Sequence, residues 1–329
     1  MNRYHRAPAL VFGLLALLSG AHNKGQTVET PLDARASDPV AIGWMVGSPP
    51  PSTKLIKFAD GSHYRFPQTR WSFSNMRQFI PTRVVARGNA TARALPRAER
   101  ADIDRITFQP IGSTERMTWA QSLAANYTDG ILILHRGRIV YERYFGVLSP
   151  TVQHLAHSVT KSFVATIATT LISEGVLDES AVVGTYVPEL RDSGFGDATI
   201  RHLLDMTTGV KYSERYAEED SPIWQFCRAN GFLPRPAGYK GPETSYAYLK
   251  GLSKERPHGE RFEYKSVNTE VLGWVMSRVT GKSLSQLLRE RFWNRLGVEQ
   301  DAYFLVDSAG TENRCRRVES HAPRPGAIR

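Results

Sequence analysis

The sequence is poor in cysteine and lacks the patterns typical of metal or nucleotide sites. Only Cys227 and Cys315 occur in 329 residues, which excludes a disulfide scaffold and a four-cysteine zinc site. Metal-ligand spacing among the histidines, a His-Glu-x-x-His pair, a Gly-x-Ser-x-Gly elbow and a Gly-rich phosphate loop are all absent from the sequence. We therefore expect neither a metal nor a cofactor, and we expect Cys227 to be a small buried residue rather than a nucleophile.

A concentrated excess of positive charge is also missing. The 42 Lys and Arg residues against 32 Asp and Glu give a net charge of +10. Residues 1–21 supply two of these charges and residues 311–329 supply three, so the surplus in between is small and scattered. Such a distribution argues against nucleic acid as a partner. A hydrophobic fraction of 41% excludes a disordered chain, and the length fits one large domain or two ordinary ones.

No apolar run is long enough to span a bilayer comfortably. The apolar stretch at residues 7–18 follows Arg3 and Arg6 and precedes Ser19-Gly20-Ala21, which fits a small-x-Ala cleavage site. The pattern predicts a signal peptide over residues 1–21 and a secreted or periplasmic protein without stable membrane insertion. An uncleaved N-terminal anchor is the alternative interpretation.

Regular structure is predicted mainly after residue 115. Residues 22–115 are expected to form an N-terminal arm and an irregular segment, because they are rich in Pro, Gly and polar residues. Ile131–Leu134 is a β-rich run, and 139–145 alternates like a second strand after the turn at 135–137. This pattern predicts a β-hairpin.

Apolar periodicity predicts four helices beyond the hairpin. Val159, Phe163 and Ile167 share one face of a long helix, and Gly175 lies where a helix would end. The other three helices are predicted over 200–206, 270–279 and 284–296, the last two joined at 280–281. Residues 211–258 are expected to be mostly loops with short helices.

The first chemically informative pattern is Ser158-x-x-Lys161 at the start of the long helix. Residues three apart lie on one helix face, so Lys161 can reach the Ser158 hydroxyl. A partly buried lysine at the positive end of a helix gives up its proton more readily and can activate a serine nucleophile. The Ser158 backbone N–H is an available oxyanion donor. The alternative is a helix N-cap followed by a surface lysine.

A second motif, Phe262-Glu-Tyr-Lys-Ser-Val-Asn-Thr269, lies about a hundred residues further on. With it, the chain resembles the serine β-lactamase and penicillin-binding-protein-like hydrolases, and within them the 6-aminohexanoate-dimer (nylon-oligomer) hydrolase group. The resemblance runs from about Trp71 to Gly310. It is carried by TDGILILHRGRIVYERYFG (128–146), HSVTKSF (157–163), FGDATIRHLLDMTTGV (195–210) and FEYKSVNTEVLGWV (262–275).

The resemblance implies a role for each matching position. Ser158 is expected to be the nucleophile that forms an acyl-enzyme, Lys161 its activator, and Tyr264 the group that relays protons to the leaving amine and helps activate water. Ser266 stands where many relatives carry Asn, which puts the third position of the Tyr element in doubt. Tyr216 falls where the nylon-oligomer group uses a loop tyrosine that closes over the substrate amide; an ordinary surface aromatic is the alternative.

The implied fold is α+β, with a β-lactamase-like antiparallel sheet flanked by helices and a partial hydrolase domain over 116–310. The implied function is a serine hydrolase for linear amide or ester bonds, with a small molecule as substrate. A carboxyl esterase and a β-lactamase or D-Ala-D-Ala peptidase relative are alternatives of the same class. A non-catalytic binding protein on the same scaffold and a genetic remnant are alternatives of other classes. The oligomeric state stays open.

The sequence departs from the family pattern at its C-terminal end. Relatives carry a Lys-Thr-Gly or His-x-Gly strand after the Tyr motif, and this chain has no such element. Residues 311–329 are expected to be a tail of different origin, because residues 313–329 are rich in Arg and Pro without apolar periodicity. One permitted codon choice for 313–329, read one base later, gives IAAGGLNLTPRDLARF, which is similar to the family's continuation. We therefore expect a frameshift, with a naturally diverged basic tail as the alternative.

If the C-terminal strands are missing, we expect two structural consequences. The hairpin over 131–145 should keep an unpaired edge, which invites aggregation. One oxyanion donor should be missing, which typically lowers the rate about 100–1000-fold. The chain is therefore predicted to be poorly stable and nearly inactive.

Overall fold

A computed structural model describes residues 32–313 of the chain. The predicted signal peptide (1–21) and residues 314–329 of the predicted tail lie outside the described residues. The helices and strands, in chain order, are α1 (Pro39–Ile42), α2 (Thr69–Ser72), β1 (Thr82–Val85), β2 (Thr107–Phe108), β3 (Met117–Thr118), α3 (Trp119–Ala125), β4 (Gly130–His135), β5 (Arg138–Tyr144), α4 (Val159–Ser173), α5 (Val183–Tyr186), α6 (Ile200–Leu204), α7 (Pro222–Ala229), α8 (Ser245–Lys250), α9 (Ser266–Thr280), α10 (Leu284–Leu288) and β6 (Ala302–Leu305).

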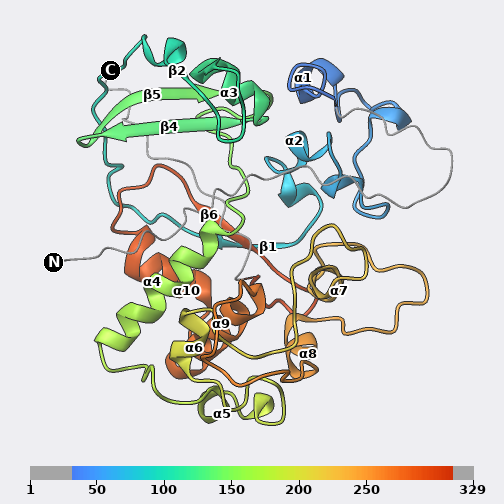
Figure 1. Ribbon diagram of the computed structural model, residues 1–329, viewed down its shortest axis with the longest axis vertical. Helices are drawn as coiled ribbons and strands as arrows, with labels where there is room; N and C mark the ends of the chain where they lie inside the picture. The colour runs from blue at the N-terminus through green and yellow to red at the C-terminus, as the bar shows by residue number, and fades with distance from the viewer. Residues whose placement is uncertain (1–31, 314–329) are drawn as a thin grey trace.

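The α+β architecture expected from the sequence is confirmed. Figure 1 shows the β4–β5 hairpin and α3 at one end of the molecule, α4 to α10 (the helical lobe) at the other end, and β1 with β6 between them. All three sheets in the described chain are antiparallel and two-stranded. No helix among residues 32–313 is long and apolar enough to cross a membrane.

The predicted hairpin forms, with Gly130 opposite Tyr144 and His135 opposite Arg138. Its turn places Gly137 at a φ of +74°, a conformation that glycine adopts without strain. The outer edge of β5 is covered, because the Ala98 N–H donates to the Ile139 carbonyl at 2.8 Å. In the described part of the chain β4 pairs with β5 alone, so no described strand covers the far edge of β4.

The long helix predicted after residue 158 is α4, and Gly175 follows its end at a φ of +70°. The pair predicted over 270–279 and 284–296 is also present, with changed bounds. The first is α9, which begins at Ser266. The second ends as an α-helix at Leu288 and continues as one π-helical turn, Arg289–Trp293. Apolar periodicity does not distinguish these two helix types.

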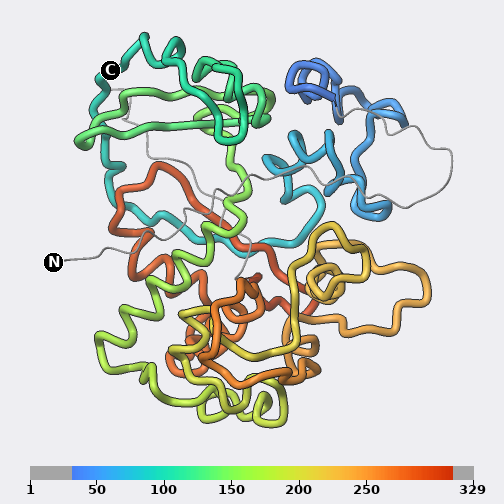
Figure 2. Tube along the Cα trace, viewed as in Figure 1, coloured from blue at the N-terminus to red at the C-terminus, as the bar shows by residue number. Residues whose placement is uncertain are grey.

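The pairing of β1 with β6 brings residues from the predicted N-terminal arm into the core. Thr82 lies opposite Leu305 and Val85 opposite Ala302. Met76, Ile80 and Val85 are buried in the main hydrophobic cluster. Figure 2 shows the N-terminal segment (blue) beside the loops after α6 (yellow to orange), where the rings of Tyr64 and Phe232 lie 4.7 Å apart. Residues 56–85 are thus part of the folded unit rather than a separate arm.

The last described residues are also packed. The Glu312 carboxylate is buried and accepts the backbone N–H groups of Leu284 at 2.7 Å and Ser285 at 3.1 Å. These donors open α10, where backbone N–H groups lack intrahelical acceptors. The Asn313 N–H donates to the Leu305 carbonyl at 2.9 Å. Residues 311–313, which the sequence assigns to the tail, therefore complete the domain.

Candidate active site

Ser158 is presented at the start of α4 by an unusual backbone conformation. The preceding residue, His157, has a φ of +43°, which is costly for a residue with a side chain and recurs at functional sites. The His157 ring packs edge-on against Phe73 with their centroids 4.6 Å apart. Ser158 itself is exposed, so its hydroxyl is open to a substrate.

The Ser158 hydroxyl faces Lys161 rather than the helix backbone. Lys161 lies one turn along α4 and its Nζ donates to Ser158 Oγ at 3.1 Å. The Ser158 side chain makes no capping hydrogen bond to the helix. Lys161 is only 8% exposed, so the interpretation as an N-cap followed by a surface lysine is wrong.

Tyr264, in the segment that leads into α9, completes the arrangement. Its hydroxyl donates to Ser158 Oγ at 2.6 Å, and the Lys161 Nζ lies 4.8 Å from the centroid of its ring. Two groups, one three residues and the other 106 residues from Ser158 in sequence, thus donate to the same oxygen atom. The described residues contain no cluster of three or more His, Cys, Asp or Glu side chains that could hold a metal ion.

The residues on either side of Tyr264 anchor its backbone. Lys265 is fully buried, donates to the Val210 carbonyl and lies 3.2 Å from a Glu263 carboxylate oxygen. Arg256 donates to the same carboxylate at 2.6 Å. Burial raises the pKa of the Glu263 carboxyl, but hydrogen bonds from Arg256 and Lys265 outweigh this and lower the pKa below its ordinary value. The Tyr264 hydroxyl, in contrast, contacts Ser158 Oγ.

The site has one backbone donor suited to a developing oxyanion. The Ser158 N–H precedes the first turn of α4 and therefore lacks an intrahelical acceptor. It adjoins the Ser158 hydroxyl and lies at the positive end of a 15-residue helix. The Ser158 hydroxyl, the Lys161 amine, the Tyr264 phenol and this N–H therefore all come from the start of α4 and the segment that leads into α9.

The two predicted substrate-binding residues, Tyr216 and Ser266, both contact Glu214. The Tyr216 hydroxyl donates to Glu214 Oε2 at 2.5 Å, and the Tyr216 ring packs edge-on against Trp224 at 5.8 Å. Tyr216 is 44% exposed. Ser266 is buried, and its backbone N–H donates to Glu214 Oε1 at 2.5 Å.

Glu214 was not predicted from the sequence. It joins Tyr216 to Ser266 through its two carboxylate oxygens. An indirect signal exists, because Lys265 occupies the N-cap position of α9 and lysine cannot cap a helix with a side-chain acceptor. A helix start without a local cap needs an acceptor from elsewhere in the chain, but the sequence does not say from where.

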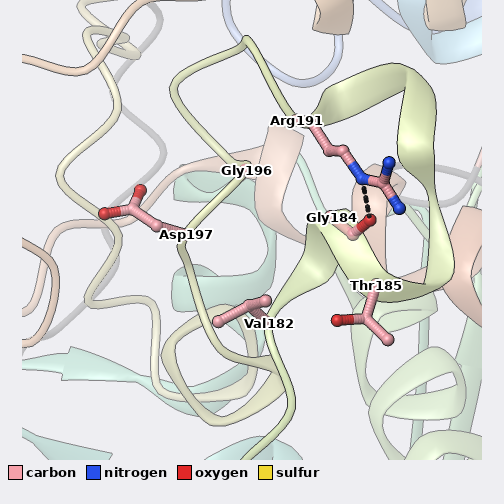
Figure 3. A pocket seen from close by; sticks show the side chains of 6 residues that line it. All are labelled: Val182, Gly184, Thr185, Arg191, Gly196 and Asp197. Carbon is pink, nitrogen blue, oxygen red and sulfur yellow. Dashed lines mark hydrogen bonds between the residues drawn. The ribbon is translucent and has the colours of Figure 1, made fainter.

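An open hollow of about 460 Å³ lies elsewhere in the helical lobe. Figure 3 shows it, with Arg191 Nε donating to the Gly184 carbonyl at 3.1 Å. It is lined by Val182, Gly184, Thr185, Arg191, Gly196 and Asp197. None of these residues belongs to the Ser158 cluster, so this hollow is not the candidate active site.

Comparison with known proteins relates this geometry to one family. The family model described as "Beta-lactamase" matches residues 120–327. The chain is 32% identical to the 6-aminohexanoate-dimer hydrolase of Paenarthrobacter ureafaciens over 244 residues, which cover 74% of this chain and 59% of that protein. It is 24% identical to a beta-lactamase of Providencia stuartii over 215 residues, which cover 65% of this chain and 49% of that protein.

A solved structure gives the same relationship. A Bacillus anthracis protein, provisionally assigned as a 6-aminohexanoate-dimer hydrolase, superposes with a TM-score of 0.75 at 30% identity, over 84% of this chain and 70% of that one. The chain spans 59% of the length of the curated Paenarthrobacter hydrolase. Because the family match covers more than half of the chain and includes α4 and α9, the protein belongs to the beta-lactamase family.

Proposed function

We propose that the protein is a serine hydrolase that cleaves linear amide or ester bonds through an acyl-enzyme on Ser158. The observation that carries the proposal is the convergence of Lys161 Nζ and Tyr264 OH on Ser158 Oγ, at 3.1 and 2.6 Å. Hydrogen-bond contact between a hydroxyl nucleophile and its acid/base partners is the geometry that nucleophilic catalysis requires.

The chemistry proceeds in two balanced halves. The step needs a pair that carries one proton fewer, with Tyr264 as the phenolate beside the Lys161 ammonium. Tyr264 then takes the Ser158 hydroxyl proton as Oγ attacks the substrate carbonyl carbon, and the Ser158 N–H stabilises the oxyanion. The carbonyl–nitrogen or carbonyl–oxygen bond then breaks, the leaving group takes a proton from Tyr264, and an ester to Ser158 remains. Water attacks this ester, gives its proton to the pair, and releases the acid product with the Ser158 hydroxyl restored.

The first substrate to test is a short linear amide of the aminohexanoate-oligomer type. Two relatives carry 6-aminohexanoate-dimer hydrolase in their descriptions, at 32% and 30% identity. The prediction of very low turnover for this chain stays a prediction.

A carboxyl esterase is the second candidate, favoured by apolar surface near the nucleophile. Val159, next to Ser158, is 58% exposed. An apolar side chain at this position suits an apolar acyl group. A β-lactamase or D-Ala-D-Ala peptidase is the third candidate.

The test uses the purified chain, a fluorophosphonate, and three substrates: the 6-aminohexanoate dimer, p-nitrophenyl butyrate and nitrocefin. We expect covalent labelling of the wild type and none of Ser158→Ala. The fastest turned-over substrate identifies the subclass. A wild type that resists labelling and hydrolyses none of the three overturns the proposal. Ligand binding that survives Ser158→Ala without any labelling supports the binding-protein alternative.

We also propose that residues 1–21 direct export. The support is the sequence pattern of Arg3 and Arg6, an apolar run and a small-x-Ala site. Mass spectrometry of the protein recovered after expression in a bacterium tests this. A mature N-terminus at residue 22 is expected, and an intact Met1 in the cytoplasmic fraction contradicts it.

A further inference from the structure

Glu214 joins two parts of the chain that both serve the candidate active site. Its Oε2 accepts the Tyr216 hydroxyl at 2.5 Å and its Oε1 accepts the Ser266 backbone N–H at 2.5 Å. Tyr216 lies in the loop between β-bridge residue Val210 and α7, whereas Ser266 is the first residue of α9 and follows Tyr264 by two positions. The carboxylate is therefore a bridge between the loop and the Tyr264 segment.

The start of α9 depends on this bridge, because nothing local replaces it. Lys265 occupies the N-cap position and makes no side-chain capping bond. The first backbone N–H groups of a helix need an outside acceptor, and a negative charge there is favourable. Charge-assisted hydrogen bonds to a carboxylate are stronger than neutral ones. Losing the bridge leaves the first turn of α9 freer to shift.

Ser266 follows Tyr264 by only two residues, so a shift of the backbone at Ser266 also moves Tyr264. Lys265 and Glu263 anchor the segment on the side away from Ser158. Glu214 fixes the helix end of the same segment. The 2.6 Å contact between the Tyr264 hydroxyl and Ser158 Oγ depends on the backbone staying between these two anchors.

We infer that Glu214 is a positioning residue that couples the Tyr216 loop to Tyr264. This inference rests on the proposed function, in which Tyr264 transfers protons at Ser158. Glu214 does not reach the reacting atoms itself; it acts by fixing Tyr264. A substrate that draws the Tyr216 hydroxyl away from the carboxylate changes one end of the bridge, so occupancy of the loop is communicated to the catalytic phenol.

The test compares Glu214→Ala with Glu214→Gln and a matched control. Gln keeps one acceptor oxygen of the two, so it should be intermediate. Glu219→Ala is the control, because Glu219 is an exposed carboxylate of the same loop. We expect Glu214→Ala to lower kcat about 10–100-fold with KM changed less than about threefold, since small misplacements of a catalytic group have effects of this size. Glu219→Ala should retain wild-type kinetics.

A double mutant separates positioning from a general loss of structure. In a Tyr264→Phe background the phenol no longer transfers protons, so Glu214→Ala should lower kcat by less than about threefold. An equal loss in both backgrounds overturns the inference, because a merely structural role does not depend on the Tyr264 hydroxyl.

Hydrogen exchange tests the bridge without any turnover. In the wild type the Ser266 amide is held by Glu214, and Glu214→Ala should speed exchange in the peptide that contains it, whereas Glu219→Ala should not. Faster exchange in a protein that hydrolyses nothing confirms the anchor and locates the failure in the proposed function. Unchanged exchange overturns the inference even when the hydrolase is active.

Discussion

Helix α9 and strand β4 are both rich in apolar residues but differ in how far those residues are buried. Every residue from Ser266 to Met276 is buried, whereas no residue of β4 is buried and Leu134 is 49% exposed. The helix packs against α4, α5, α6, α8 and α10. The strand has β5 on one edge and, within residues 32–313, no strand on the other. The apolar residues of α9 are thus covered by neighbouring helices, whereas those of β4 stay partly exposed.

This difference separates the chemistry from the sheet. Ser158 and Lys161 belong to the start of α4, and Tyr264 leads into α9. The contacts among them are made in the helical lobe, and β4 and β5 supply none of the three groups. A damaged hairpin should therefore affect solubility before it affects the geometry at Ser158.

The largest expected effect is on the chemistry of the helical lobe. Tyr264→Phe removes the hydroxyl 2.6 Å from Ser158 Oγ and should lower kcat about 10²–10⁴-fold, the usual contribution of a positioned acid/base group. Steady-state kinetics on whichever substrate is turned over measures it, with circular dichroism to confirm the fold. Activity within threefold of wild type would remove Tyr264 from the mechanism.

A pair of leucine substitutions compares the stability of the two regions directly. Leu171 in α4 is completely buried, and Leu134 in β4 is half exposed. Leu171→Ala should lower the free energy of unfolding by about 2–5 kcal/mol, whereas Leu134→Ala should cost less than about 1 kcal/mol. Urea unfolding followed by circular dichroism gives both values. Equal losses would show that the hairpin is as tightly packed as the helical lobe.

The open edge of β4 should make the protein associate. Leu134→Lys places a charge on that strand, and charged residues on edge strands block pairing between molecules. We expect the light-scattering signal of concentrated protein to fall in this variant. Ile111→Lys is the matched control, because Ile111 is 91% exposed and lies outside every strand. Equal scattering by both variants and the wild type would show that the protein does not associate through the edge of β4.

The smallest expected effect is a pH dependence within the helical lobe. The Gly209 N–H donates to His258 Nδ1 at 2.8 Å, and His258 Nε2 lies 3.0 Å from Asp197, with Lys254 and His202 nearby. Burial lowers the pKa of His258 below its ordinary value of 6.5, although Asp197 opposes the shift. The unfolded chain therefore binds the proton more readily than the folded one.

The sign of the effect follows from this shift. The stability that neutral His258 contributes is fully present above pH 6.5 and is lost as the pH falls through the lowered pKa. His258→Asn keeps an acceptor for the Gly209 N–H and cannot titrate. Urea midpoints measured from pH 8 to pH 5 should fall more steeply for the wild type than for this variant. Parallel curves would exclude His258 as the source.

Local patterns predicted the hairpin, α4 and the Ser158–Lys161 pair, because each depends on residues close together in the chain. The same patterns predicted α9 but not its start, since four further residues before Glu270 are helical. Apolar periodicity could not predict β1, because a four-residue strand with one buried residue has no periodic signal. Its partner is some 220 positions away, so pairing rather than propensity makes it a strand.

Site residues that are close together in the sequence could be predicted from a motif. Site residues that only the fold brings together could not. Ser158 and Lys161 are three positions apart on one helix, so their contact follows from helix geometry. The position of Tyr264 came from resemblance to a family, because 106 residues separate it from Ser158. Glu214 belongs to a loop, where no periodicity says which way a side chain points.

The pairing of β1 with β6 also determines how late in synthesis this part of the core can form. Val85 leaves the ribosome long before its partner Ala302 is made, and at about 5–20 residues per second the delay is roughly 10–40 s. Through that interval Met76, Ile80 and Val85, which end in the core, have no finished surface to cover them. Chaperones that hold emerging apolar segments should therefore engage residues 76–85 early and release them only after Ala302 has been made.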